Sequence, residues 1–147
     1  MVAEQNKVVD TGLVVLTYRG ELPTMNEVLS LNRFQYSKLK KRFNHNLGWS
    51  FHEQYRGNPV ITGAFSTIIR WYRSNKKFDS DNVGLGQKFI FDGLQHGKVI
   101  KNDTWNQTAN GILHQFAIDK KDPRVEVYLL LGKRLHIDPY TIAGVTK

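Results

Sequence analysis

Two aspartates separated by a single residue, Asp79 and Asp81, are the residues of this 147-residue chain best suited to do chemistry. Side chains two residues apart on an extended chain project to the same side, so we expect these carboxylates to point together. A third carboxylate, Asp103, follows after a segment of helical character and a glycine turn. If that helix packs back on the preceding strand, the three carboxylates approach one another. Oxygen ligands of this kind suit Mg²⁺, with Mn²⁺ as the other candidate.

Lys88, inside the predicted helix, adds a fixed positive charge to this set. A metal ion on the carboxylates would offset their repulsion, make a bound water more acidic and stabilise charge on a phosphate. Lys88 would then stabilise a developing oxyanion. The same residue types are favoured helix caps, so residues 79–82 are equally open to interpretation as a capping turn. We interpret Asp92, four residues after Lys88, as the intrahelical partner that orients the lysine.

The rest of the chain carries a large excess of positive charge. The 21 lysines and arginines against 13 aspartates and glutamates give a formal net charge of +8 at pH 7. With a pI near 9.8, the chain meets the electrostatic criterion for a nucleic-acid-binding domain, although charge alone does not separate DNA from RNA or from an acidic membrane surface. The cations that we expect to dock phosphates are Lys38, Lys40, Lys41, Arg42, Arg70, Arg73, Lys76 and Lys77.

Composition also excludes several classes of protein. With no cysteine, the chain has neither a disulfide framework nor a cysteine zinc site, which suits the cytoplasm, where we expect the protein to act. No apolar run approaches the roughly 18 residues of a membrane span, so we expect no membrane association of that kind. We expect a single domain over residues 1–147, with a loose leader at 1–10 and a C-terminal tail of unknown role at 133–147.

Hydrophobic patterning in the first half of the chain predicts two strands and a helix. Residues 12–19 are apolar and β-branched, which predicts a buried strand, and the alternation over 60–72 predicts another. Between them, Asn32 is a suitable N-cap for a helix over residues 33–47, where apolar side chains recur at helical spacing.

In the second half, helical signals begin near residue 85 and end at Gly97, a suitable C-cap. Residues 111–119 and 124–131 alternate as strands, and the short polar loop 120–123 predicts that they form a hairpin. The resulting order, β-α-β-α-β-β, favours an α+β fold of two layers, with a mixed four-stranded sheet and helices on one face.

These motifs together resemble the signature of the RusA-type Holliday junction resolvases. That signature is Asp-x-Asp-Asn, a lysine in the next helix, an aspartate four residues beyond it, and an Asp-Asp pair after a short turn. The resemblance spans about residues 12–132, and the matching stretches are Phe78-Asp79-Ser80-Asp81-Asn82, Lys88, Asp92-Gly93-Leu94 and Val99-Ile100-Lys101-Asn102-Asp103.

The resemblance implies that Asp79, Asp81 and Asp103 are metal-binding catalytic carboxylates and that Lys88 is a catalytic lysine. It further implies a Mg²⁺-dependent homodimer that hydrolyses phosphodiester bonds in four-way DNA junctions, in recombination or phage DNA processing. Asn102 departs from the signature, because it replaces the first aspartate of the Asp-Asp pair. The alternative is therefore a non-catalytic nucleic-acid-binding protein on the same scaffold.

Overall fold

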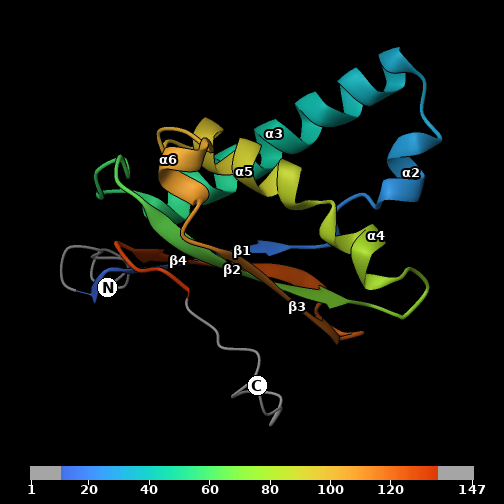
Figure 1. Ribbon diagram of the computed structural model, residues 1–147. Helices are drawn as coiled ribbons and strands as arrows, with labels where there is room; N and C mark the ends of the chain where they lie inside the picture. The colour runs from blue at the N-terminus through green and yellow to red at the C-terminus, as the bar shows by residue number, and fades with distance from the viewer. Residues whose placement is uncertain (1–10, 136–147) are drawn as a thin grey trace, which may run out of the picture.

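The computed structural model describes residues 11–135. They form a four-stranded mixed sheet that helices cover on one face (Figure 1). In spatial order, the strands are β1 (Leu13–Arg19), β4 (Arg124–Leu131), β2 (Phe65–Arg73) and β3 (Ile112–Ile118). β4 pairs antiparallel with both β1 and β2, whereas β3 pairs parallel with β2. The predicted α+β class, with two layers and a mixed sheet, is confirmed.

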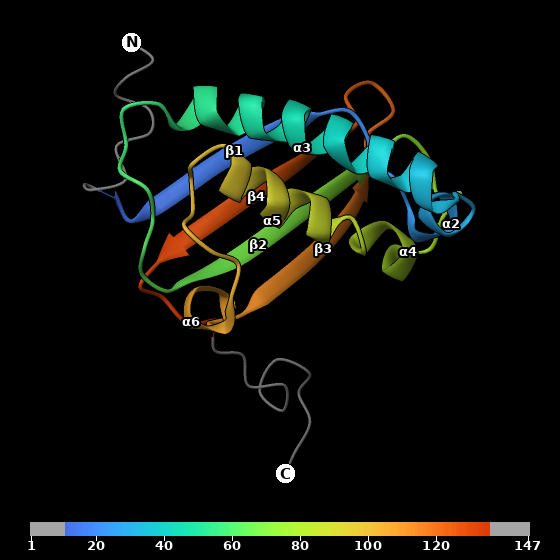
Figure 2. The ribbon, with the colours of Figure 1, turned by 90° about the horizontal axis from the view of Figure 1, so that it is seen from above.

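Two longer helices, α3 (Arg33–Tyr55) and α5 (Gln87–His96), lie side by side over the sheet (Figure 2). The predicted element order omitted the short helices that connect them to the strands. These are α2 (Met25–Leu29), α4 (Ser80–Gly84) and α6 (Trp105–Thr108). No helix within residues 11–135 has both the length and the apolar character to cross a membrane. The predicted leader, and the predicted tail beyond residue 135, lie outside the described residues.

The start of α3 is as predicted, but its end is not. Asn32 forms a capping box, in which its side chain accepts a hydrogen bond from the Gln35 backbone N–H at 2.8 Å and the Gln35 side chain accepts one from the Asn32 backbone N–H at 3.0 Å. The helix passes the predicted end at residue 47 because Leu47, Phe51 and Tyr55, one turn apart, are all buried in the core.

Glycines allow α3 and α5 to pack closely together. A Cβ atom on Gly93 would lie 2.6 Å from the Leu47 Cβ, and one on Gly48 would lie 2.9 Å from the His96 Cβ. Any side chain at these positions would force the helices apart, since protein interiors have no spare volume. The contact explains why α3 continues through a glycine, and it fixes α5 in place over the sheet.

The predicted hairpin between the last two strands is wrong. β3 and β4 are not neighbours, because β2 lies between them. Val125, Val127 and Leu129 of β4 are buried, whereas residues 115–118 of β3 are exposed. The more apolar strand therefore takes the position with partners on both sides, and β3 takes the edge, which it reaches by a crossover from β2 through α4, α5 and α6.

The strand predicted over 60–72 is shifted toward its C-terminal end. β2 begins at Phe65, and the preceding segment instead pairs with the chain that leaves α5. The Ile61 backbone N–H donates to the Val99 carbonyl at 2.8 Å, and the Lys101 N–H donates to the Ile61 carbonyl at 3.0 Å. This bridge holds the segment that leads to Asp103.

Candidate active site

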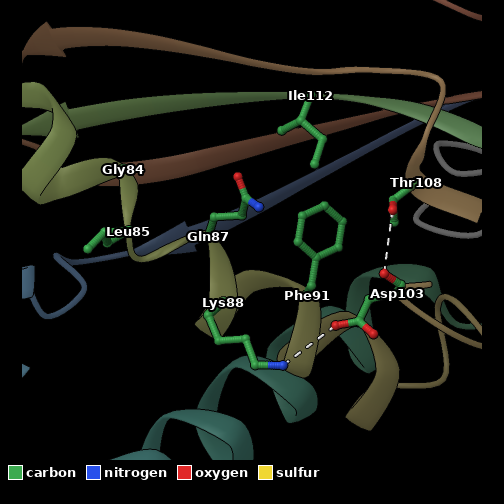
Figure 3. A pocket seen from close by; sticks show the side chains of 8 residues that line it. All are labelled: Gly84, Leu85, Gln87, Lys88, Phe91, Asp103, Thr108 and Ile112. Carbon is green, nitrogen blue, oxygen red and sulfur yellow. Dashed lines mark hydrogen bonds and ion pairs between the residues drawn. The ribbon is translucent and has the colours of Figure 1, made fainter. Parts of the chain in front are cut away.

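A pocket of about 250 Å³ lies between the start of α5, the segment around α6 and strand β3 (Figure 3). Two of the predicted site residues, Lys88 and Asp103, line it and come from different segments of the chain. The full lining is Gly84, Leu85, Gln87, Lys88, Phe91, Asp103, Thr108 and Ile112.

The ammonium group of Lys88 pairs with two carboxylates. Its Nζ atom lies 2.9 Å from Asp92 Oδ1 and 3.7 Å from Asp103 Oδ2, the second pair being the one drawn in Figure 3. The hydrogen bond to Asp92, with the negative charges of both carboxylates, raises the pKa of Lys88 against the opposing effect of burial. Lys88 is therefore cationic at neutral pH, and the prediction that Asp92 orients it is confirmed.

Asp92 is the less exposed member of this pair, at 13% of its side chain against 60% for Lys88. Its second oxygen, Oδ2, is buried and has no hydrogen-bond partner among the described residues. Lys88 stands in the first turn of α5, which holds no acidic residue, and a positive charge there opposes the helix dipole. Asp92, one turn later, offsets that cost.

Asp79 and Asp81 do not lie on an extended chain, so that expectation is wrong. Helix α4 begins at Ser80, which makes Asp79 its N-cap and places Asp81 inside its first turn. The capping interpretation describes the backbone correctly, yet the Asp79 side chain makes no capping hydrogen bond. Asp81 Oδ1 accepts a hydrogen bond from the Asn82 backbone N–H at 2.9 Å. Both carboxylates are exposed.

The structure brings Lys88 and Asp103 together but does not place the α4 aspartates in the same pocket lining. Gly84, at the end of α4, lines the pocket, whereas Asp79 and Asp81 do not. Within the described part of the chain, no three His, Cys, Asp or Glu side chains form a group that could hold a metal ion. The donor chemistry nevertheless suits Mg²⁺, which binds through a few carboxylates and keeps several waters.

Most of the predicted phosphate-docking cations lie on α3 or just before α4. Lys38, Lys41 and Arg42 are exposed on α3, and Lys76 and Lys77 are exposed in the loop before α4. Such positions leave the ammonium and guanidinium groups accessible to a large polyanion.

Lys40, on the same helix, lines a polar groove of about 510 Å³ between α3 and α5. The groove also reaches Asp92, the partner of Lys88, and Lys98. Lys98 was missed from the sequence. It directly follows the C-cap of α5 and has a positive φ of 62°, so no helical or strand periodicity draws attention to it.

The two arginines predicted on β2 have structural partners. Arg73 is only 13% exposed, pairs with Glu21 at 2.9 Å and donates to the Leu22 carbonyl at 3.1 Å, so it holds the loop after β1 against β2. Arg70 is exposed and donates to Gln115 Oε1 at 2.7 Å. By strand alternation, Arg70 projects from the face opposite to that of the buried Ile69 and Trp71, away from the helices.

His114 on β3 was not identified as a site residue from the sequence, although the structure connects it to the pocket. Its Nε2 atom lies 2.8 Å from Oε1 of Gln87, which lines the pocket beside Lys88. Burial lowers the pKa of His114. The alternating pattern of β3 indicated only that His114 shares a face with Ile112, and no local signal links it to a residue 27 positions earlier.

Comparison of the chain with models of known protein families found no match, and comparison with curated proteins found no similar sequence. The chemistry of the site is therefore inferred from its residues and their geometry.

Proposed function

We propose that this protein is a metal-dependent endonuclease that hydrolyses phosphodiester bonds in branched DNA, with the four-way junction as its substrate. The observation that carries the proposal is the contact of Lys88 with Asp103 at 3.7 Å in one pocket, with Asp92 orienting the lysine at 2.9 Å. These three residues are the ones that the RusA-type signature marks in this part of the chain. Their convergence supports that resemblance.

In the proposed reaction, Asp79, Asp81 and Asp103 would hold Mg²⁺, and the bound ion would supply the charge that polarises the phosphate and makes a water more acidic. Lys88 stabilises negative charge on the phosphate oxygens as the transition state forms. Asp92 keeps the Lys88 ammonium group charged and directed at the pocket. The pairing is mutual, because the largely buried Asp92 carboxylate needs Lys88 as its countercharge. Asp103 would serve both as a metal ligand and as a partner of Lys88, because it contacts Lys88 directly.

The DNA backbone binds to the cations around this pocket. Lys40 and Lys98 line the groove that reaches Asp92, so positive charge continues from the α3–α5 groove to Lys88. Contacts of this kind position the duplex without reading its sequence, and their contribution weakens as salt rises. Arg70 and Arg73 fall outside the proposed contact surface, because one points away from the helices and the other is paired with Glu21.

The proposed active species is a cytoplasmic homodimer, in which two copies of the site cut paired strands of one junction. Sedimentation velocity of the free protein and of its junction complex measures this stoichiometry. Two protein chains for each junction are expected, and one chain for each junction contradicts the dimer.

The function is tested with a synthetic four-way junction labelled on each arm, incubated with purified protein in Mg²⁺ or in chelator. Symmetric nicks are expected only with Mg²⁺, and Asp81→Asn and Asp103→Asn should abolish them. Asp122→Asn is the matched control, since Asp122 pairs with Arg19 and Arg124 and lies outside the pocket lining. Nicking that survives Asp81→Asn refutes the assignment of the active-site residues. Absence of nicking on every branched substrate refutes the proposal that the protein is a nuclease.

A non-catalytic branched-DNA-binding protein is the second candidate. It is favoured by the lack of a three-carboxylate group within residues 11–135 and by Asn102 in place of an aspartate. This candidate predicts junction binding that is indifferent to Mg²⁺ and unchanged in Asp103→Asn. Gel-shift titrations of both proteins, with and without Mg²⁺, separate it from the nuclease.

A further inference from the structure

A chain of hydrogen bonds runs from the hydrophobic core to the pocket through His114. Trp71 of β2 is 1% exposed, and its indole Nε1–H donates to His114 Nδ1 at 2.9 Å. The two ring planes are parallel to within 6°, with centroids 6.0 Å apart, so the rings lie edge to edge across this hydrogen bond. His114 Nε2 then lies 2.8 Å from Gln87 Oε1.

Trp71 determines which atom donates and which accepts in each of these hydrogen bonds. An indole nitrogen can only donate, so His114 Nδ1 is the acceptor and the imidazole proton resides on Nε2. His114 Nε2–H therefore donates, and the Gln87 atom that faces it must be the carbonyl oxygen rather than the amide nitrogen. The orientation of the Gln87 carboxamide is thereby fixed, with its two N–H donors turned away from His114.

Close packing holds the backbone next to Gln87 against these two rings. A Cβ atom on Gly86 would lie 2.9 Å from Trp71 Cη2, and one on Gly84 would lie 3.6 Å from His114 Nδ1. The junction between α4 and α5 thus rests directly on Trp71 and His114. A turn of the helix start would press on the buried Trp71 ring, and a turn of the carboxamide would break its hydrogen bond to His114.

We propose that Gln87 is a substrate-contacting residue whose amide N–H groups donate to a non-bridging phosphate oxygen, and that His114 is the positioning residue that orients it. Gln87 lines the same pocket as Lys88 and Asp103, and Figure 3 shows its carboxamide nitrogen on the side of Phe91. Lys88 supplies charge from a flexible stem, whereas Gln87 supplies donors of fixed direction. Phosphate oxygens only accept hydrogen bonds, so their chemistry complements such donors.

This inference rests on the proposed function for the source of the phosphate, the DNA backbone, but not for the orientation of Gln87. The decisive variant is Gln87→Glu. A carboxylate keeps the oxygen that accepts from His114 Nε2–H, so the structural role is retained, while the donor nitrogen becomes an anionic oxygen that repels phosphate. Gln115→Glu is the matched control, because Gln115 lies on the sheet face away from the helices.

The first measurement is a metal-free titration with inorganic phosphate, followed by NMR at the Gln87 side-chain NH₂ and the Lys88 backbone amide. Saturable shifts are expected in the native protein and in Gln115→Glu, with affinity about ten- to a hundredfold weaker in Gln87→Glu at an unchanged Tm. His114→Phe retains a ring between Trp71 and Phe116 and should weaken phosphate binding less than Gln87→Glu does. An NH₂ signal that ignores phosphate, or native affinity in Gln87→Glu, overturns the proposal.

The second measurement is junction cleavage in Mg²⁺, and it separates the two proposals. If the native chain cleaves no junction while the Gln87 NH₂ still responds to phosphate, the nuclease function fails and the donor role stands. If native protein and Gln87→Glu cleave with equal kcat/KM, the donor role fails and the nuclease function stands.

Discussion

Replacing Lys88 by methionine should destabilise the protein, although Lys88 is 60% exposed. Asp92 Oδ1 accepts from the ammonium group at 2.9 Å, and Asp92 Oδ2 is buried without a hydrogen-bond partner among the described residues. Methionine retains most of the aliphatic stem but removes the charge. The carboxylate then stays in a site where only 13% of its side chain is exposed, with no countercharge from Lys88.

The size of the effect lies between two limits. An exposed ion pair contributes about 0–1 kcal/mol, whereas removing one partner from a fully buried pair costs about 3–5 kcal/mol. With one exposed and one largely buried partner, Lys88→Met should lower the free energy of unfolding by about 1–2 kcal/mol. For a chain of this length, that corresponds to a fall in Tm of about 2–8 °C.

The assay is urea unfolding at pH 7, followed by circular dichroism, for a double-mutant cycle with Asp92→Asn. The double variant should recover most of the stability lost in Lys88→Met, because the unpaired charge has gone. Lys41→Met is the matched control and should change stability by less than about 0.5 kcal/mol, as expected for an exposed surface lysine. Native stability in Lys88→Met, or further destabilisation on adding Asp92→Asn, refutes the reasoning.

Three further predictions follow from the packing, the histidine and the surface charge. Gly93→Ala should destabilise by about 1–3 kcal/mol in urea unfolding, because the new methyl group meets Leu47 Cβ 2.6 Å away. Because burial lowers the pKa of His114, the folded state binds fewer protons than the unfolded state, and His114 should reduce Tm as pH falls below about 6.5. His114→Phe should remove that component, and an unchanged pH profile contradicts it. Replacing Lys40 and Lys41 by alanine should reduce the slope of log K against log salt for junction binding by about 1.8, and an unchanged slope places both lysines outside the interface.

Local sequence signals identified the parts of the fold that local interactions determine. The N-cap at Asn32 and the C-cap at Gly97 are at the predicted positions. The Lys88–Asp92 pair is also local, because residues four apart share a helix face. The hydrophobic pattern likewise indicated the mixed sheet and the helical layer, since alternation and helical periodicity report which face of each element is buried.

Features that depend on tertiary packing could not be predicted from local sequence signals. The short loop 120–123 suggested a hairpin, yet the buried positions of β4 are satisfied only by partners on both sides. The site departs from expectation for a similar reason, because α4 begins at Ser80 and removes Asp79 and Asp81 from an extended conformation. The contact of His114 with Gln87 depends on β3 lying beneath the α4–α5 junction, which no local pattern records.

The position of β4 has a consequence for the order in which the molecule can fold. β4 comes last among the strands within residues 11–135, yet Val127 pairs with both Leu16 of β1 and Ile69 of β2. Until residues 124–131 have been synthesised, β1 has no partner in the sheet and β2 has one open edge. These long-range pairings delay formation of the sheet until residues 124–131 have been made. A chain that stops before residue 124 therefore lacks the support for α5, and a protein proposed to cut DNA gains its cutting geometry only after β4 has been made.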